Sequence, residues 1–174
     1  MLRTSTDGAV VRMLLRSDGS TTLLLESLLD RKLTVEVTGQ YLASREEIHP
    51  DILAHLQTES TDRLYIRRSA LQTDERIKVS FNYLVMRVPL GQENLYETLC
   101  TRDIPLGKQI ANNRIEHHRH LIGDGRIEQE IDGRKRVCYF KHYLLELSRE
   151  PIFYIHESFH PDYLPVEDTF AIRG

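Results

Sequence analysis

The sequence predicts an α+β fold in which helices flank an antiparallel β-sheet. After residue 60, most segments have the pattern of strands that follow one another at hairpin spacing, and strands joined by short polar turns pair antiparallel. Helical patterns are confined to the N-terminal part and to one insertion near the middle, so the regular strand–helix alternation of a parallel sheet is missing. A chain of 174 residues fits one domain, which we expect to span residues 1–174.

The first clear element is an amphipathic helix in the segment GSTTLLLESLLDRKL, residues 19–33. Ser20 or a neighbouring threonine can cap its N-terminus, and leucines at 24, 25, 28 and 29 form an apolar stripe. In the segment that follows, Leu33, Val35 and Val37 alternate with polar residues. This alternation is typical of a half-buried strand.

The next segments predict a loop and then a hairpin. Residues 44–61 are polar and contain Pro50, which cannot lie inside a regular helix. We therefore expect a loop with a short helix at 50–57. Residues 63–72 and 77–88 have strand patterns and are joined by the polar turn TDER, which indicates a hairpin.

A helical insertion separates this hairpin from the remaining strands. Residues 92–101 place Leu95 and Leu99 on one helical face. Pro105 and Gly107 then indicate a turn. We expect a second short helix to start there, because proline suits the first position of a helix.

The last third of the chain is expected to return to strands. Asp-Gly sequences at 123–125 and 132–133 predict turns, because this dipeptide is favoured in hairpins. Residues 134–148 predict a long strand and residues 152–159 the next one. The remaining residues, 160–174, contain two prolines and are expected to form a surface segment.

The composition narrows the classes of function. It is 40% hydrophobic and 28% charged, with a net charge of −3. Proteins that bind nucleic acids or anionic membranes are normally basic, so neither partner is expected. Cys100 and Cys138 are isolated and form no zinc or redox motif. The apolar runs are only a few residues long, so we expect no signal peptide, no transmembrane helix and a cytoplasmic location.

Three histidines, His117, His118 and His120, lie close together in IEHHRHLIGDG. On a strand, His118 and His120 would share a face and could ligate a metal. No carboxylate at a suitable spacing accompanies them, so solvated histidines are the simpler interpretation and no metal site is predicted. The GDG that follows lacks the preceding apolar strand and following helix of a phosphate-binding loop, which again favours a turn.

Two adjacent arginines, Arg67 and Arg68, raise a physical question in the strand segment LYIRRSAL. Successive strand side chains point to opposite faces, so one arginine points inward if one face is buried. A buried guanidinium is costly unless an anion meets it. Periodicity leaves open which face is buried. A structural interpretation is that Arg67 forms an ion pair with Glu157 across the sheet.

Four segments in order resemble the chorismate pyruvate-lyase family, and more closely its compact branch in archaea and bacteria. They are LLLESLLDRKLTVEVTGQYL, LYIRRSAL, DIPLGKQI and PIFYIHESFHP. The resemblance extends from about residue 20 to about residue 162. It implies an antiparallel sheet flanked by helices, with an internal ligand cavity closed by helical flaps. It also implies cleavage of chorismate into 4-hydroxybenzoate and pyruvate without a metal or organic cofactor.

The resemblance also implies roles for individual residues. The family's arginine for the ring carboxylate falls on Arg67, and its catalytic glutamate, near the C4 oxygen of the ring, falls on Glu157. The leucine whose backbone contacts the ligand falls on Leu106, and an apolar cavity residue falls on Leu29.

The family's second arginine is not matched, because Val85 stands at its place. Arg87 lies two residues further on, on the same face of a strand. We therefore take Arg87 as the candidate for binding the enolpyruvyl carboxylate.

Three functional interpretations follow. The first is a chorismate lyase with small-molecule partners only, namely chorismate and 4-hydroxybenzoate, acting as a monomer or homodimer. The second is an aromatic-acid-binding module of the same fold without turnover, since a related fold forms the effector-binding domain of some bacterial regulators. The third is a structural domain in which Arg67 and Glu157 only pair.

Overall fold

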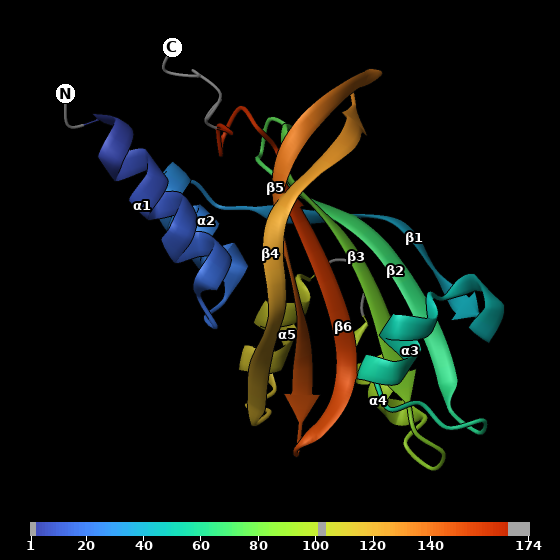
Figure 1. Cartoon of the computed structure of the whole chain (residues 1–174). Coiled ribbons are helices and arrows are strands. Elements are labelled where there is room, and N and C mark those ends of the chain that lie inside the picture. The colour runs from blue at the N-terminus through green and yellow to red at the C-terminus, as the bar shows by residue number, and fades with distance from the viewer. Residues whose placement is uncertain (1–2, 101–103, 167–174) are drawn as a thin grey trace.

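A computed structural model describes residues 3–100 and 104–166 of the chain. In this part of the chain, six antiparallel strands form one curved sheet with the order β1-β2-β3-β6-β5-β4 (Figure 1). This arrangement confirms the α+β prediction. The strands are β1 (Thr34–Ala43), β2 (Arg63–Gln72), β3 (Lys78–Val88), β4 (His117–Ile131), β5 (Arg134–Leu147) and β6 (Glu150–Phe159).

The helices that begin at Thr21, Pro50, Asn94 and Leu106 lie where the sequence indicated them, whereas the sequence patterns did not place the helix Arg3–Arg16 or the 3₁₀ turn Arg45–Glu47. The capping prediction at Ser20 is confirmed, because its side chain accepts a hydrogen bond from the backbone N–H of Leu23 over 3.4 Å. None of the helices in the described residues is long and apolar enough to cross a membrane. The helices are α1 (Arg3–Arg16), α2 (Thr21–Leu29), the 3₁₀ turn η1 (Arg45–Glu47), α3 (Pro50–His55), α4 (Asn94–Leu99) and α5 (Leu106–Asn112).

The register of the three central strands determines which side chains share a face. In the β2–β3 hairpin, Arg67 lies directly opposite Leu84. Leu84 in turn lies opposite Ile155 of β6, a strand from the far end of the sequence. Side chains directly opposite one another in a sheet point to the same face. Arg67, Leu84 and Ile155 therefore point to one side of the sheet.

The turn predicted at residues 123–125 is wrong, because β4 continues through this segment to Ile131. The two glycines have a packing role instead. A Cβ atom at Gly123 would lie 3.0 Å from Nε2 of His142, and one at Gly125 would lie 3.1 Å from the ring of Phe140. Glycine leaves room for the rings on neighbouring β5. The Asp-Gly sequence at 132–133 does form the turn between β4 and β5.

The C-terminal segment is only partly a surface segment. Leu164 is buried in an apolar cluster with residues of α1 and α2, and Tyr163 packs against the same cluster. Residues 167–174 of the predicted surface segment lie outside the described residues.

Both faces of the sheet are covered. The face opposite Arg67 packs against α3 through a cluster that includes Leu64, Ile66 and Val85. On the face of Arg67, one cluster lies under α4 and α5 and includes Leu84 and Ile155. A second cluster on α1 and α2 includes Leu71.

Candidate functional site

A small cavity, partly open to solvent, lies between these last two clusters and is called the central cavity below. Its volume is about 60 Å³, and its walls come from the sheet, the N-terminus of α2 and the start of α5. Leu106 and other apolar side chains form much of the wall. The polar side chains that line the cavity are Ser20, Thr21, Thr22, Arg67, Ser69, Asn82, Arg119, Tyr143 and Glu157.

Arg67 lines the central cavity and is only 3% exposed. Its neighbour Arg68 is exposed on the other face, where its guanidinium lies 5.0 Å from the centre of the Tyr83 ring. The prediction that Arg67 points inward is therefore confirmed. A buried guanidinium in this position provides a strong cationic hydrogen-bond donor inside a largely apolar wall.

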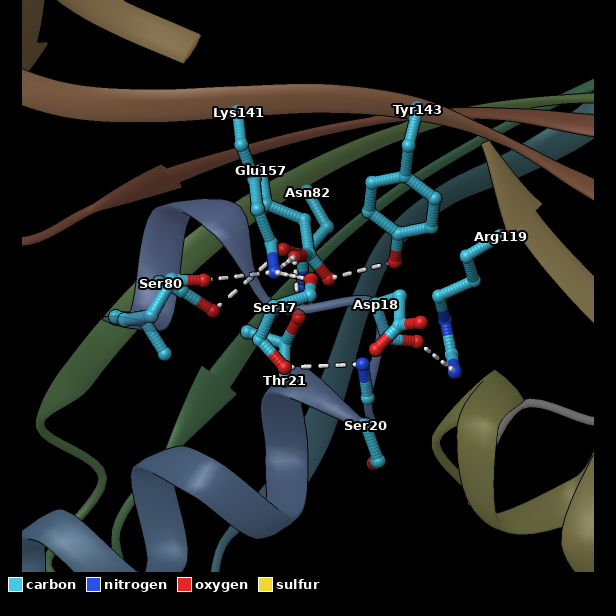
Figure 2. A network of polar contacts seen from close by, with 12 residues as sticks. Ser17, Asp18, Ser20, Thr21, Ser80, Asn82, Arg119, Lys141, Tyr143 and Glu157 are labelled. Atoms are coloured by element: carbon cyan, nitrogen blue, oxygen red, sulfur yellow. Dashed lines mark hydrogen bonds and ion pairs between the residues drawn. The ribbon is translucent and has the colours of Figure 1, made fainter. Parts of the chain in front are cut away.

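Glu157 lines the same cavity from β6 and receives hydrogen bonds on both carboxylate oxygens (Figure 2). The hydroxyl of Thr21 donates to Oε2 over 2.7 Å, and the hydroxyl of Tyr143 donates to Oε1 over 3.2 Å. The ammonium of Lys141 lies 3.9 Å from Oε2. Two hydroxyl donors and one cation thus orient an acceptor group in the cavity wall.

Tyr143 is a buried hydrogen-bond donor in this network. Burial raises the pKa of its phenol well above the ordinary value of 10.0, and the negative charge of Glu157 raises it further, while Arg119 partly opposes both effects. The phenol therefore remains protonated around neutral pH and donates to Glu157.

Arg119 of β4 was missed by the sequence reasoning. One of its terminal nitrogens donates to the backbone carbonyl of Asp18 over 3.0 Å (Figure 2). Its Nε is buried and has no hydrogen-bond partner among the described residues. A buried N–H without a partner is costly and marks a place where a bound group could accept a hydrogen bond.

The neighbours of Arg119 contained the missed signal. Arg119 lies between His118 and His120, which are both exposed. Because side chains alternate along a strand, the residue between two exposed histidines points to the inner face. The start of α5 lies against this side chain, since a Cβ at Gly107 would be in ordinary van der Waals contact with Arg119 Nη2, at 3.8 Å.

Two predicted site residues do not line the central cavity. Arg87 lies on the face of Val85, opposite the cavity, and its Nε donates to Asp62 Oδ2 over 2.8 Å. Leu29 packs against the apolar cluster of α1 and α2. The structure therefore brings together Arg67, Leu106 and Glu157, but not Arg87 or Leu29.

An ion pair links the two helical segments that cover the cavity. Glu26 of α2 accepts a hydrogen bond from Lys108 of α5 over 2.8 Å and another from the backbone N–H of Leu33 over 2.9 Å. Burial alone would raise the pKa of Glu26, but these hydrogen bonds, together with the charges of Lys108 and Lys32, lower it below its ordinary value of 4.5. The pair holds α5 against α2.

Comparison with known proteins identified one matching family and several solved structures with a similar fold. Residues 15–166 match the sequence model of a family described as chorismate pyruvate-lyase Rv2949c-like. A search of curated proteins gave no significant match.

Several solved structures share the fold. They include PhnF from Mycobacterium smegmatis, with a TM-score of 0.64, 11% identity and coverage of 86% of this chain and 67% of that chain. The possible transcriptional regulator YydK from Bacillus subtilis has a TM-score of 0.56 and 10% identity. This match covers 77% of this chain and 61% of that chain. The effector-binding domain of the trehalose repressor TreR from B. subtilis has a TM-score of 0.52 and 12% identity. This match covers 81% of this chain and 99% of that chain. At these identities, the likeness establishes the fold alone.

Proposed function

Because the chain belongs to the Rv2949c-like chorismate pyruvate-lyase family, we propose that it cleaves chorismate into 4-hydroxybenzoate and pyruvate in the central cavity. The observation that best supports the proposal is the presence of a buried arginine, Arg67, and an oriented carboxylate, Glu157, in the wall of one cavity. An aromatic hydroxy acid has a complementary anion at one end and a hydroxyl at the other.

Arg67 would bind the ring carboxylate. Its planar guanidinium offers two parallel N–H donors to a carboxylate, which gives direction as well as attraction. In a buried site, this interaction is stronger than the same pair in water. The apolar wall, which includes Leu84 and Leu106, would contact the ring.

Glu157 would accept a hydrogen bond from the C4 hydroxyl of the ring. Thr21, Tyr143 and Lys141 all face the carboxylate as donors or cations, and an ionised carboxylate has lone pairs left for a further donor. The hydroxyl is present in both substrate and product, so this contact would orient the ring throughout the reaction.

The chemistry itself needs mainly orientation. The C3–O bond of the enolpyruvyl ether breaks, and its electron pair leaves with the oxygen. The proton at C4 departs, and the electron pair of that C–H bond completes the aromatic ring. Enolpyruvate then takes up a proton at its methylene carbon and becomes pyruvate. Because aromatisation drives the elimination, placing the charges and excluding water supply most of the catalysis.

We propose Arg119, in place of Arg87, as the partner of the enolpyruvyl carboxylate. Arg87 is already paired with Asp62 on the opposite face of the sheet. Arg119 lines the central cavity and has a buried Nε without a partner among the described residues. A second carboxylate at this position would accept a hydrogen bond from that nitrogen.

Ligand entry would require the helical cover to move. The central cavity of about 60 Å³ is smaller than the roughly 150 Å³ that holds a benzene molecule in an engineered protein cavity. The Glu26–Lys108 ion pair connects the two segments that would have to separate. Opening and closing of α5 against α2 would then precede and follow the chemistry.

A direct assay tests the proposal. Purified protein, without added cofactor, is mixed with chorismate, and 4-hydroxybenzoate and pyruvate are measured by chromatography and by a coupled lactate dehydrogenase assay. We expect equal amounts of the two products at a rate proportional to protein concentration. Product formation no faster than in a protein-free control would reject the lyase activity.

The second candidate is an aromatic-acid-binding domain without turnover. Its support is the fold shared with the effector-binding domain of TreR, at a TM-score of 0.52. Calorimetry with 4-hydroxybenzoate separates the two candidates when combined with the assay above. Binding of the product together with turnover of chorismate supports the lyase, whereas binding without turnover supports the binding domain.

A further inference from the structure

Lys141 is a buried cation next to the central cavity that contacts Glu157 but would not contact the substrate in the proposed reaction. It lies in the middle of β5 and is only 1% exposed, and it is not part of the cavity wall. Lysine is almost never fully buried unless it is paired, because its ammonium loses its hydration. A specific set of partners must therefore offset this cost.

The partners of Lys141 join two parts of the molecule (Figure 2). Its Nζ donates to the backbone carbonyls of Leu14, over 3.0 Å, and of Ser17, over 3.4 Å, at the C-terminal end of α1. Carbonyls at this end of a helix have no partner within the helix and carry partial negative charge. On the other side, Nζ lies 3.9 Å from Oε2 of Glu157.

The pKa of Lys141 lies below its ordinary value of 10.5. Burial lowers the pKa of Lys141, and the positive charge of Arg119 lowers it further, whereas Glu157 and Asp18 raise it. The contacts with Glu157 and with the end of α1 thus offset part of the cost of burying the ammonium.

We propose that Lys141 is a positioning residue, which ties the Glu157 carboxylate to the C-terminal end of α1 and so fixes its direction in the cavity. This inference rests on the proposed function. The two other donors, Thr21 and Tyr143, are hydroxyls whose hydrogens can rotate. Two backbone carbonyls hold the Lys141 ammonium in place, so its position, and with it the attraction on the Glu157 carboxylate, does not change when a ligand binds.

The test is a double-mutant cycle between Lys141 and Glu157. Wild type, Lys141→Met, Glu157→Gln and the double variant are compared for kcat/KM with chorismate, for the Kd of 4-hydroxybenzoate and for thermal unfolding. Lys135→Met is the matched control, because Lys135 lies on the same strand with its side chain 78% exposed. If Lys141→Met does not fold, Lys141→Gln takes its place, since an amide still donates to the helix carbonyls.

We expect Lys141→Met to lower kcat/KM about tenfold or more, since a misplaced contact group is costly for catalysis. In the Glu157→Gln background, the same change should cost less than about twofold, because Lys141 acts through Glu157. Lys135→Met should have no effect.

Two outcomes would overturn the inference while the proposed function stands. The first is an equal loss of kcat/KM from Lys141→Met in the wild-type and Glu157→Gln backgrounds, as a purely structural role would give. The second is unchanged kcat/KM in all Lys141 variants. If the wild type binds 4-hydroxybenzoate but does not turn over chorismate, the lyase proposal fails and the same cycle is evaluated from the Kd values. A wild type that neither binds nor reacts overturns both proposals.

Discussion

Arg67 and Glu157 line one cavity from strands β2 and β6, which both pair with β3. Across β3, Glu157 lies opposite Asn82, and Asn82 lies opposite Ser69, two residues along β2 from Arg67. The guanidinium and the carboxylate thus belong to neighbouring positions on one sheet face. The sheet therefore presents a cation and an acceptor to the same small volume.

The two adjacent arginines of β2 form a matched pair for mutation. Arg67→Ala should lower kcat/KM for chorismate at least about 100-fold, because it removes the main donor to the ring carboxylate. Arg68→Ala removes an exposed guanidinium from the other face and should change activity less than about twofold. Thermal unfolding of both variants serves as the folding control. Equal losses of activity in the two variants would contradict the role of Arg67.

Substitution of Arg119 should affect substrate and product differently. Chorismate has two carboxylates and 4-hydroxybenzoate has one. Arg119→Gln should raise the KM for chorismate about 10- to 100-fold, the usual cost of losing a hydrogen bond to a charged group. The Kd of 4-hydroxybenzoate, measured by calorimetry, should change less than about twofold. Arg126→Gln, an exposed position on the same strand, is the control. Equal weakening of both ligands would exclude a separate site for the second carboxylate.

The product should inhibit the reaction. Arg67 and Glu157 would hold the two ends of 4-hydroxybenzoate once the helical cover has moved to admit it, and the cover would have to move again before the product leaves. We therefore expect slow product release and competitive inhibition. Benzoate lacks the hydroxyl that Glu157 would bind and should inhibit about tenfold more weakly. Initial rates with each acid added provide the measurement. Absence of inhibition at millimolar 4-hydroxybenzoate would rule out tight retention of product.

The ion pair between α2 and α5 should contribute to stability in a pH-dependent way. The pKa of Glu26 is lower in the folded protein than its ordinary value of 4.5. Its contribution is therefore fully present above pH 4.5 and is lost as the pH falls through the folded value. At pH 7, Glu26→Gln should reduce the free energy of unfolding by about 1–2 kcal/mol, because a buried carboxylate loses two donors.

Urea unfolding at several pH values measures this effect. The gap between wild type and Glu26→Gln should narrow steadily below pH 4.5. Glu128→Gln is the control, because Glu128 pairs with Lys135 on the surface and its side chain is 59% exposed. That variant should match the wild type throughout. A gap for Glu26→Gln that stays constant down to pH 3 would show that the charge of Glu26 is not involved.

Local signals in the sequence predicted most helices and strands, because caps, turns and alternation depend only on residues that are close together in the chain. Ser20 caps α2, and the turn after Gln72 forms the predicted hairpin. The segment at Gly123–Gly125 misled the prediction, because glycine serves turns and close packing equally well. Only the ring of His142 on the neighbouring strand shows which role applies.

The error at Arg87 has a different cause. Alternation showed correctly that Val85 and Arg87 share a face, but it did not say which face of β3 matches that of Arg67. The register places Leu84 opposite Arg67, so Val85 and Arg87 point away from the cavity. A change of one residue in register exchanges the two faces of a strand, and pairing between strands sets that register.

By itself, the sequence determined the α+β class, the positions of α2, α3, α4, α5 and most strands, and the presence of one inward arginine in β2, because each follows from periodicity and capping along the chain. Only the tertiary structure decided that Arg67, Arg119, Tyr143 and Glu157 meet in one cavity, and that Lys141 joins Glu157 to α1. These residues come from four strands, and their proximity depends on the pairing of β3 with β6 and of β5 with both β4 and β6. Such long-range pairing depends on how the whole core packs.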